Sequence, residues 1–181
     1  KRHDVQAGIQ VGPDDKAQLE RAVSLLNDAI GALEQSETLK YRTNWIGNRA
    51  VAYKLLGEQD KALADAELAI KLDPDKAGFL RQKAFLLHEQ GKSDEAVELF
   101  RKILGNPEVP EVALLLGGLF HERGDNDEAI KILEESIKNT DKPGDMLSEE
   151  KRVLIHAYLG KNEPDRARTL ATELRSSNPG S

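Results

Sequence analysis

The sequence predicts an all-α fold, an α-solenoid assembled from antiparallel helix pairs. A glycine followed five residues later by an alanine recurs three times, at intervals of 34 and 33 residues. The pairs are Gly57 and Ala62, Gly91 and Ala96, and Gly124 and Ala129. Apolar residues recur at three- and four-residue spacing on both sides of each glycine, which is typical of two amphipathic helices joined by a tight turn. A short period of this kind indicates small stacked units.

A fourth copy is centred on Asn162, followed five residues later by Ala167. Asparagine is the expected substitute for glycine where the backbone adopts the left-handed conformation. Pro74 and Pro179 lie 105 residues apart, which equals the three spacings taken together. The last spacing is 38 residues, so we expect residues 139–148 to form a loop that holds the additional residues.

Each copy also carries the residues that suit a helix–turn–helix. An aspartate three residues after the turn residue fits the positive end of the second helix. Small residues on the first helix let the second helix approach closely, and a larger side chain there would overpack the contact. The aspartates are Asp60, Asp94, Asp127 and Asp165, and the small residues are Ala50, Ala84 and Gly117.

This pattern resembles the tetratricopeptide repeat. The resemblance rests on the turn residues, the alanines and the small residues named above, together with a large residue four positions before each turn residue and a proline that ends a copy. The large residues are Tyr53, Leu87, Phe120 and Tyr158, and the prolines are Pro74 and Pro179. The resemblance implies a right-handed superhelix of four repeats, preceded by one N-terminal helix.

The spacing sets the predicted boundaries. We predict a tail or the remnant of a preceding repeat at 1–14, an N-terminal helix at 15–36, and repeats at 43–76, 77–109, 110–143 and 148–181. The N-terminal helix fits either a cap or the second helix of a repeat whose first helix is missing. Because the chain begins with Lys1 and solenoids need polar terminal caps, we expect part of a longer protein, and the uncapped ends leave self-association open.

Composition narrows the classes of function. The 181 residues carry a formal net charge of −6 and contain no cysteine. The acidic balance disfavours nucleic-acid binding, which calls for a basic excess. Disulfides, thiolate nucleophiles and cysteine-ligated zinc are excluded. No apolar stretch approaches the roughly 20 residues that span a bilayer, so we expect a soluble chain without membrane insertion, in the cytoplasm or the periplasm.

The sequence also predicts no enzyme and no cofactor. It contains no phosphate-cradling glycine loop, no HExxH and no GxSxG pattern. The adjacent acidic pairs Glu134–Glu135 and Glu149–Glu150 are interpreted as solvated helix faces, because neighbours in a helix point about 100° apart.

The resemblance implies that the first helix of each repeat lines a concave groove. The predicted partner-binding residues are Asn44, Asn48, Arg81, Gln82, Phe85, His88, Leu114, Leu115, His121, Arg152 and His156, with Val51, Gly118 and Val153 on the same face. The alternative for Phe85, Leu114 and Leu115 is that they fold inward against a neighbouring helix. The lysine, asparagine and arginine set with which chaperone-binding members hold a terminal carboxylate is missing, so chaperone tails are not expected.

Three histidines lie on these first helices. His88 and His121 occupy equivalent sites in consecutive copies, and His156 can face the same surface. They are interpreted as polar groove residues or as ordinary solvated residues. Equivalent atoms in adjacent repeats are roughly 8–10 Å apart, which does not favour joint ligation, so no metal is predicted.

The leading functional hypothesis is a protein–protein interaction module that binds a peptide segment or a partner protein in the groove. In this hypothesis polar residues fix the register of the segment and Phe85, Leu114 and Leu115 bury its apolar side chains. The alternative is a structural spacer or self-association segment of a larger assembly.

Overall fold

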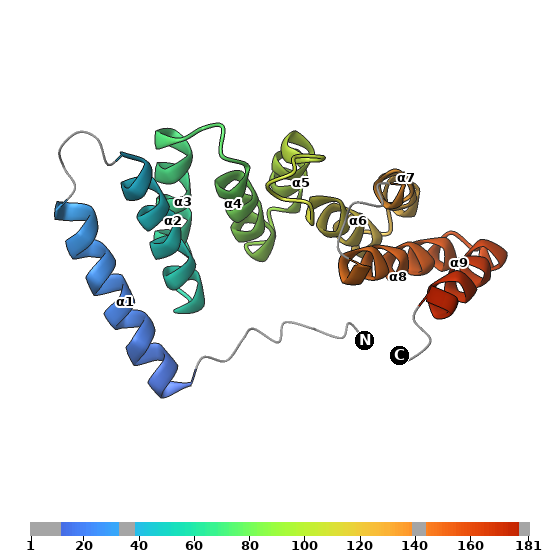
Figure 1. Cartoon of the computed structure of the whole chain (residues 1–181), viewed down its shortest axis with the longest axis horizontal. Helices are drawn as coiled ribbons and strands as arrows, with labels where there is room; N and C mark the ends of the chain where they lie inside the picture. Colours follow the sequence, from blue (N-terminus) through green and yellow to red (C-terminus); the bar gives the residue numbers. More distant parts are fainter. Residues whose placement is uncertain (1–11, 33–38, 139–143, 178–181) are drawn as a thin grey trace. The chain divides into compact units, whose positions relative to one another are not determined.

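A computed structural model describes residues 12–32, 39–138 and 144–177. Every regular element in these ranges is an α-helix, which confirms the all-α prediction (Figure 1). The helices are α1 (Pro13–Ala32), α2 (Leu39–Leu55), α3 (Gln59–Leu72), α4 (Ala77–Glu89), α5 (Ser93–Ile103), α6 (Val112–Glu122), α7 (Asn126–Ile137), α8 (Gly144–Gly160) and α9 (Pro164–Ser177).

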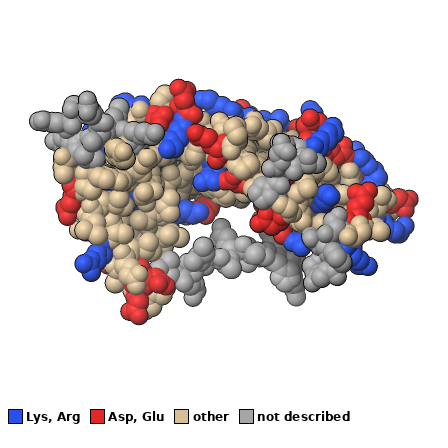
Figure 2. All heavy atoms as spheres, in the orientation of Figure 1, with Lys and Arg blue, Asp and Glu red and all other residues tan. Residues whose placement is uncertain are grey.

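The chain divides into two compact units. Unit 1 is Lys1–Lys92 and holds α1 to α4, and unit 2 is Ser93–Ser181 and holds α5 to α9. The division falls inside the segment predicted as the second repeat. Lys and Arg side chains are interspersed with Asp and Glu side chains over the visible surface (Figure 2).

In unit 1 each helix packs against the next one in the chain, α1 on α2, α2 on α3 and α3 on α4. One apolar cluster joins Ile30 of α1, Ile46 of α2, Ala69 of α3 and Phe79 of α4. Trp45 of α2 also packs against this cluster. Burial of this cluster holds α1 against the first helix pair.

In unit 2 the helices α6, α7 and α8 contact one another, while α5 packs on α6 and α9 packs on α8. Gly117 of α6 is fitted against Leu133 of α7 so closely that a Cβ atom at Gly117 would lie 2.6 Å from Leu133 Cγ. Leu133 is itself completely buried. The small residue predicted for this position is therefore required by the packing.

The turns between paired helices have the predicted left-handed residue. Gly91 has φ +78° and Asn162 has φ +62°, so asparagine does replace glycine in the fourth turn. At Gly91 the N–H of Lys92 donates to the carbonyl of Leu87 and the N–H of Gly91 to that of His88, both at 2.9 Å. These two bonds satisfy carbonyls that the end of α4 leaves without a helical partner.

The aspartates predicted after the turns also lie where expected, in the first turns of the second helices. They are Asp60 in α3, Asp94 in α5, Asp127 in α7 and Asp165 in α9.

Several predicted helix limits were wrong. Residues 144–148 were expected to form a loop, but they are the first turn of α8; the rest of that loop, 139–143, lies outside the described residues. Helix α1 starts at Pro13, two residues before the predicted start of the N-terminal helix, because proline is tolerated where the first N–H groups have no helical partner. Helix α2 starts at Leu39, four residues before the predicted start of the first repeat.

Candidate functional site

The predicted partner-binding residues of unit 1 lie on α2 and α4, and two of their amide groups already have partners within the unit. Lys76 Nζ donates to Asn44 Oδ1 at 2.9 Å, and Gln82 Nε2 donates to the backbone oxygen of Gly47 at 3.0 Å. Gln82 thus ties α4 to α2. We assign both amides to holding the helices in place, a role that the residue pattern did not reveal.

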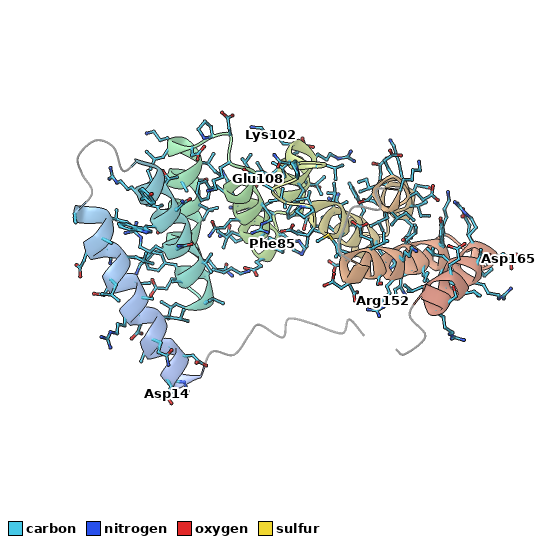
Figure 3. The ribbon with its side chains drawn as sticks, viewed as in Figure 1. Asp14, Phe85, Lys102, Glu108, Arg152 and Asp165 are labelled. Carbon is cyan, nitrogen blue, oxygen red and sulfur yellow. The ribbon has the colours of Figure 1, made fainter. Side chains whose placement is uncertain are left out.

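The remaining residues of this face in unit 1 are more accessible. Asn48 and Val51 are exposed, and Val51 keeps 46% of its surface although Ala50 and Ala52 on either side are buried. Phe85, labelled on α4 in Figure 3, is half-buried, with Lys54 Nζ 5.4 Å from its ring centre. Arg81 and His88 are half-buried as well, and both have partners of their own.

In unit 2 the predicted residues lie on α6 and α8. Leu114 and Leu115 are half-buried. Their burial is therefore intermediate between a fully exposed binding contact and complete packing against a neighbouring helix. Arg152, labelled on α8 in Figure 3, is exposed and forms an ion pair with Glu149. We call the predicted residues on α2 and α4 of unit 1, together with those on α6 and α8 of unit 2, the first-helix face.

The structure brings two of the histidines together. The rings of His121 on α6 and His156 on α8 are stacked, with centroids 6.1 Å apart and planes inclined by 29°. His121 is half-buried and His156 is exposed. His121 Nδ1 lies 2.8 Å from Asn126 Oδ1, a partner that sequence analysis missed.

The interpretation of the acidic pairs as solvated faces was wrong for two of the four residues. Glu150 is completely buried, and Ser136 Oγ of α7 donates to its Oε1 at 2.9 Å. Glu134 is half-buried and accepts a hydrogen bond from Tyr158 Oη at 2.7 Å and an ion pair from Arg166. The error arose because neighbouring residues on a helix point in different directions, so one member of each pair faces the next helix.

Tyr158 is the residue whose acidity changes most. Burial of the ring, together with the hydrogen bond to Glu134, raises the pKa of Tyr158 to about 12. Both causes favour the neutral phenol, because a phenolate would lose hydration and face a carboxylate. Arg166 also stacks over the ring, with its guanidinium carbon 4.3 Å from the ring centre. Tyr158 therefore acts as a neutral structural donor between α7 and α8.

Other features of the described residues lie away from the first-helix face or add no chemistry to it. A pocket of 390 Å³ between α7, α8 and α9 is lined by Tyr158, Arg166 and Leu170, among others, and by none of the predicted residues. In the described ranges no group of three or more His, Cys, Asp or Glu side chains is placed to hold a metal ion together. None of the described helices is long and apolar enough to cross a membrane.

Comparison with known proteins identifies the repeat. Two family descriptions, both named tetratricopeptide repeat, match residues 46–76 and 87–145. The small glutamine-rich tetratricopeptide repeat-containing protein 2 of Saccharomyces cerevisiae is 37% identical over 71 residues, which are 39% of this chain and 20% of the yeast protein. The match thus spans about a fifth of that relative.

Solved structures agree on the fold. A tetratricopeptide repeat protein from Parabacteroides merdae aligns with a TM-score of 0.74 at 17% identity, over 93% of this chain and 63% of that one. BtubC from P. vanneervenii aligns with a TM-score of 0.70 at 21% identity, over 93% of this chain and 77% of that one. The helix pairs, the left-handed turn residues and the family matches agree that this chain carries tetratricopeptide repeats, over residues 46–76 and 87–145.

Proposed function

We propose that the chain binds a segment of a partner protein on its first-helix face and has no catalytic role of its own. Tetratricopeptide repeat proteins generally mediate protein–protein interactions, and this general role defines the broad class of function. The finer assignment to the first-helix face is supported by how its side chains are placed within each unit.

One observation carries the proposal. Val51 is 46% exposed in the middle of α2, beside the exposed amide of Asn48. Burial of an exposed apolar side chain supplies binding energy, and an adjacent amide supplies a hydrogen bond that fixes the register of a bound segment. Phe85 on α4 adds a half-buried aromatic ring to the same unit.

Unit 2 offers a surface of similar character. Leu114 and Leu115 supply apolar area on α6, while Arg152 supplies an exposed cation on α8. Because Arg152 is paired with Glu149 on the surface, it can exchange this partner for an acidic group of a ligand at small cost.

Selection from a displayed random-peptide library, followed by affinity measurement on variants, tests the proposal. Val51→Asp should weaken peptides that bind unit 1 at least tenfold, and Arg152→Glu should weaken peptides that bind unit 2 at least tenfold. Two matched controls lie on second helices: Leu68→Asp, which replaces an apolar residue of α3 that is 39% exposed, and Arg168→Glu, which disrupts a surface pair on α9 of the same spacing as Arg152–Glu149. The controls should leave the affinity unchanged.

The opposite pattern would refute the proposal. Peptides that lose affinity only with Leu68→Asp or Arg168→Glu would place binding on the second helices. Light scattering of the same variants completes the test. The self-association alternative would be favoured if the chain selects no peptide and forms a concentration-dependent oligomer that none of these substitutions affects.

A further inference from the structure

The contact between His121 and His156 points to a second kind of ligand on unit 2. Imidazole nitrogens are the preferred ligands of zinc and its neighbours among divalent transition metals. The ring centroids lie 6.1 Å apart on helices that pack together. Because the ring planes are inclined by only 29°, the exposed His156 ring has to turn out of the stack before both imidazoles can bind a single cation. Because His156 is exposed, such a cation could enter directly from solvent.

The orientation of His121 is fixed by Asn126. Asn126 Nδ2 donates to the backbone oxygen of Gly124 at 3.3 Å, which turns Oδ1 of the same amide toward His121 Nδ1 at 2.8 Å. An amide oxygen only accepts, so Nδ1 of His121 carries the proton and Nε2 keeps its lone pair. Histidines that bind metals typically donate their second ring N–H in this way to an oxygen acceptor.

The last turn of α8 is shaped around the same amide. A Cβ atom at Gly160 would lie 2.6 Å from Asn126 Nδ2 and 2.9 Å from Oδ1, so any larger residue would displace the amide. The sequence thus keeps space for the group that sets the tautomer of His121. A charged neighbour is also neutralised, since Arg152, one turn before His156, is paired with Glu149.

We propose that His121 and His156 form a two-imidazole site for a divalent cation of the zinc class, with water in the remaining coordination positions. The bound ion would cross-link α6 and α8, the two helices that contribute to the first-helix face of unit 2. The proposal rests on the histidine pair and not on peptide binding, so either proposal can fail without the other.

Titration of the full chain with Zn²⁺ by calorimetry tests the site. The experiments use a His3→Gln background, which removes the one histidine that lies outside the described residues as a competing ligand. We expect one Zn²⁺ per chain, and at least a tenfold loss of affinity in both His121→Gln and His156→Gln. Absence of saturable binding, or equal affinity in these variants, would overturn the proposal.

A matched control removes the remaining histidine of the first helices. His88 of α4 occupies the position equivalent to that of His121, and it lies in unit 1. His88→Gln should therefore leave the affinity for Zn²⁺ unchanged. A loss as large as in His121→Gln would place the ion elsewhere and contradict the assignment.

Asn126 is a positioning residue in this proposal, because it orients His121 and does not itself bind the ion. Its role can be distinguished from a purely structural one by a conservative substitution and by the tautomer of His121. Asn126→Ala should weaken Zn²⁺ binding by about tenfold or more, as loss of such a partner does in known sites. Asn126→Asp should restore it, because a carboxylate also accepts the Nδ1 proton. In ¹⁵N spectra without metal, His121 should show the Nδ1-protonated tautomer in the parent chain and lose that preference in Asn126→Ala. An unchanged tautomer and affinity would remove Asn126 from the site.

Discussion

Arg49 holds Asp65 through two parallel hydrogen bonds, from Nε to Oδ2 and from Nη2 to Oδ1, both at 2.7 Å. The pair joins α2 to α3, and the third donor, Nη1, reaches Asn27 of α1 at 2.7 Å. One guanidinium therefore connects three helices. The hydrogen bonds to Asp65 raise the pKa of Arg49, which favours the charged guanidinium.

Asp65→Ala should destabilise the chain by about 3 kcal/mol, the lower end of the range for breaking a buried ion pair. Asp65 is 7% exposed and the Arg49 side chain 17% exposed, so removal of the carboxylate leaves the Arg49 charge largely shielded from water without its counter-ion. Urea denaturation monitored by circular dichroism measures the change. Lys138→Ala, which disrupts the exposed pair with Glu135, should leave the urea midpoint where it is. Equal effects of the two substitutions would contradict the role given to Arg49.

Two adjacent glycines of α6 should respond in opposite directions to alanine. Gly117→Ala places a Cβ atom 2.6 Å from Leu133 Cγ and should cost about 1–3 kcal/mol through overpacking. Gly118 has no neighbouring atom within 4 Å of such a Cβ, so Gly118→Ala should stabilise the helix by about 0.5–1 kcal/mol. Thermal unfolding of both variants checks the pair, and a stabilising Gly117→Ala would refute the close approach of α6 and α7.

The left-handed turn residues make a second paired prediction. Asn162→Gly should leave stability unchanged or raise it slightly, because glycine adopts φ +62° without strain. Gly91→Ala, at φ +78°, should cost about 1 kcal/mol, since a side chain is disfavoured in this conformation. Gly78→Ala, within α4 and with no atom near its Cβ, is the control and should not destabilise. Differential scanning calorimetry measures the three melting temperatures. If Gly91→Ala were no less stable than Gly78→Ala and Asn162→Gly, the left-handed conformation assigned to the turns would be contradicted.

Tyr158 makes stability depend on alkaline pH. Its pKa of about 12 in the folded chain exceeds that of an unfolded tyrosine, near 10. The folded state therefore holds the proton more tightly, and the stabilisation is complete below pH 10 and declines as pH rises toward 12. The difference in unfolding free energy between the parent chain and Tyr158→Phe should shrink between pH 10 and pH 12. A difference that stays constant would show that the phenol is not held in its neutral form.

The helix–turn–helix framework was readable from the sequence because it depends on a few residues with strict local requirements. Only glycine or asparagine suits φ near +60 to +80°, and only a small residue fits at Gly117, so spacing alone located the turns and the close contacts. The helix start at Gly144 was missed, because a Pro–Gly pair is typical of a turn and the sequence has one at 143–144, whereas in the structure Gly144 starts α8.

The first-helix face was harder to predict, because side-chain partners depend on three-dimensional proximity. Asn44 and Gln82 looked like free amides, but Lys76 and the backbone of Gly47 occupy them. The contact of His121 with His156 joins residues 35 positions apart at non-equivalent places in their copies, so repeat spacing did not reveal it. Asn126 gave no sequence signal, since an asparagine at a helix start is ordinary.

Mapping of a selected peptide by NMR chemical-shift perturbation tests the proposed binding surface most directly. The account predicts that the largest shifts fall on exposed residues of the first-helix face, on Asn48 and Val51 of α2 for a peptide that binds unit 1 and on Arg152 of α8 for a peptide that binds unit 2. Shifts confined to the second helices α3, α5, α7 and α9 would contradict it.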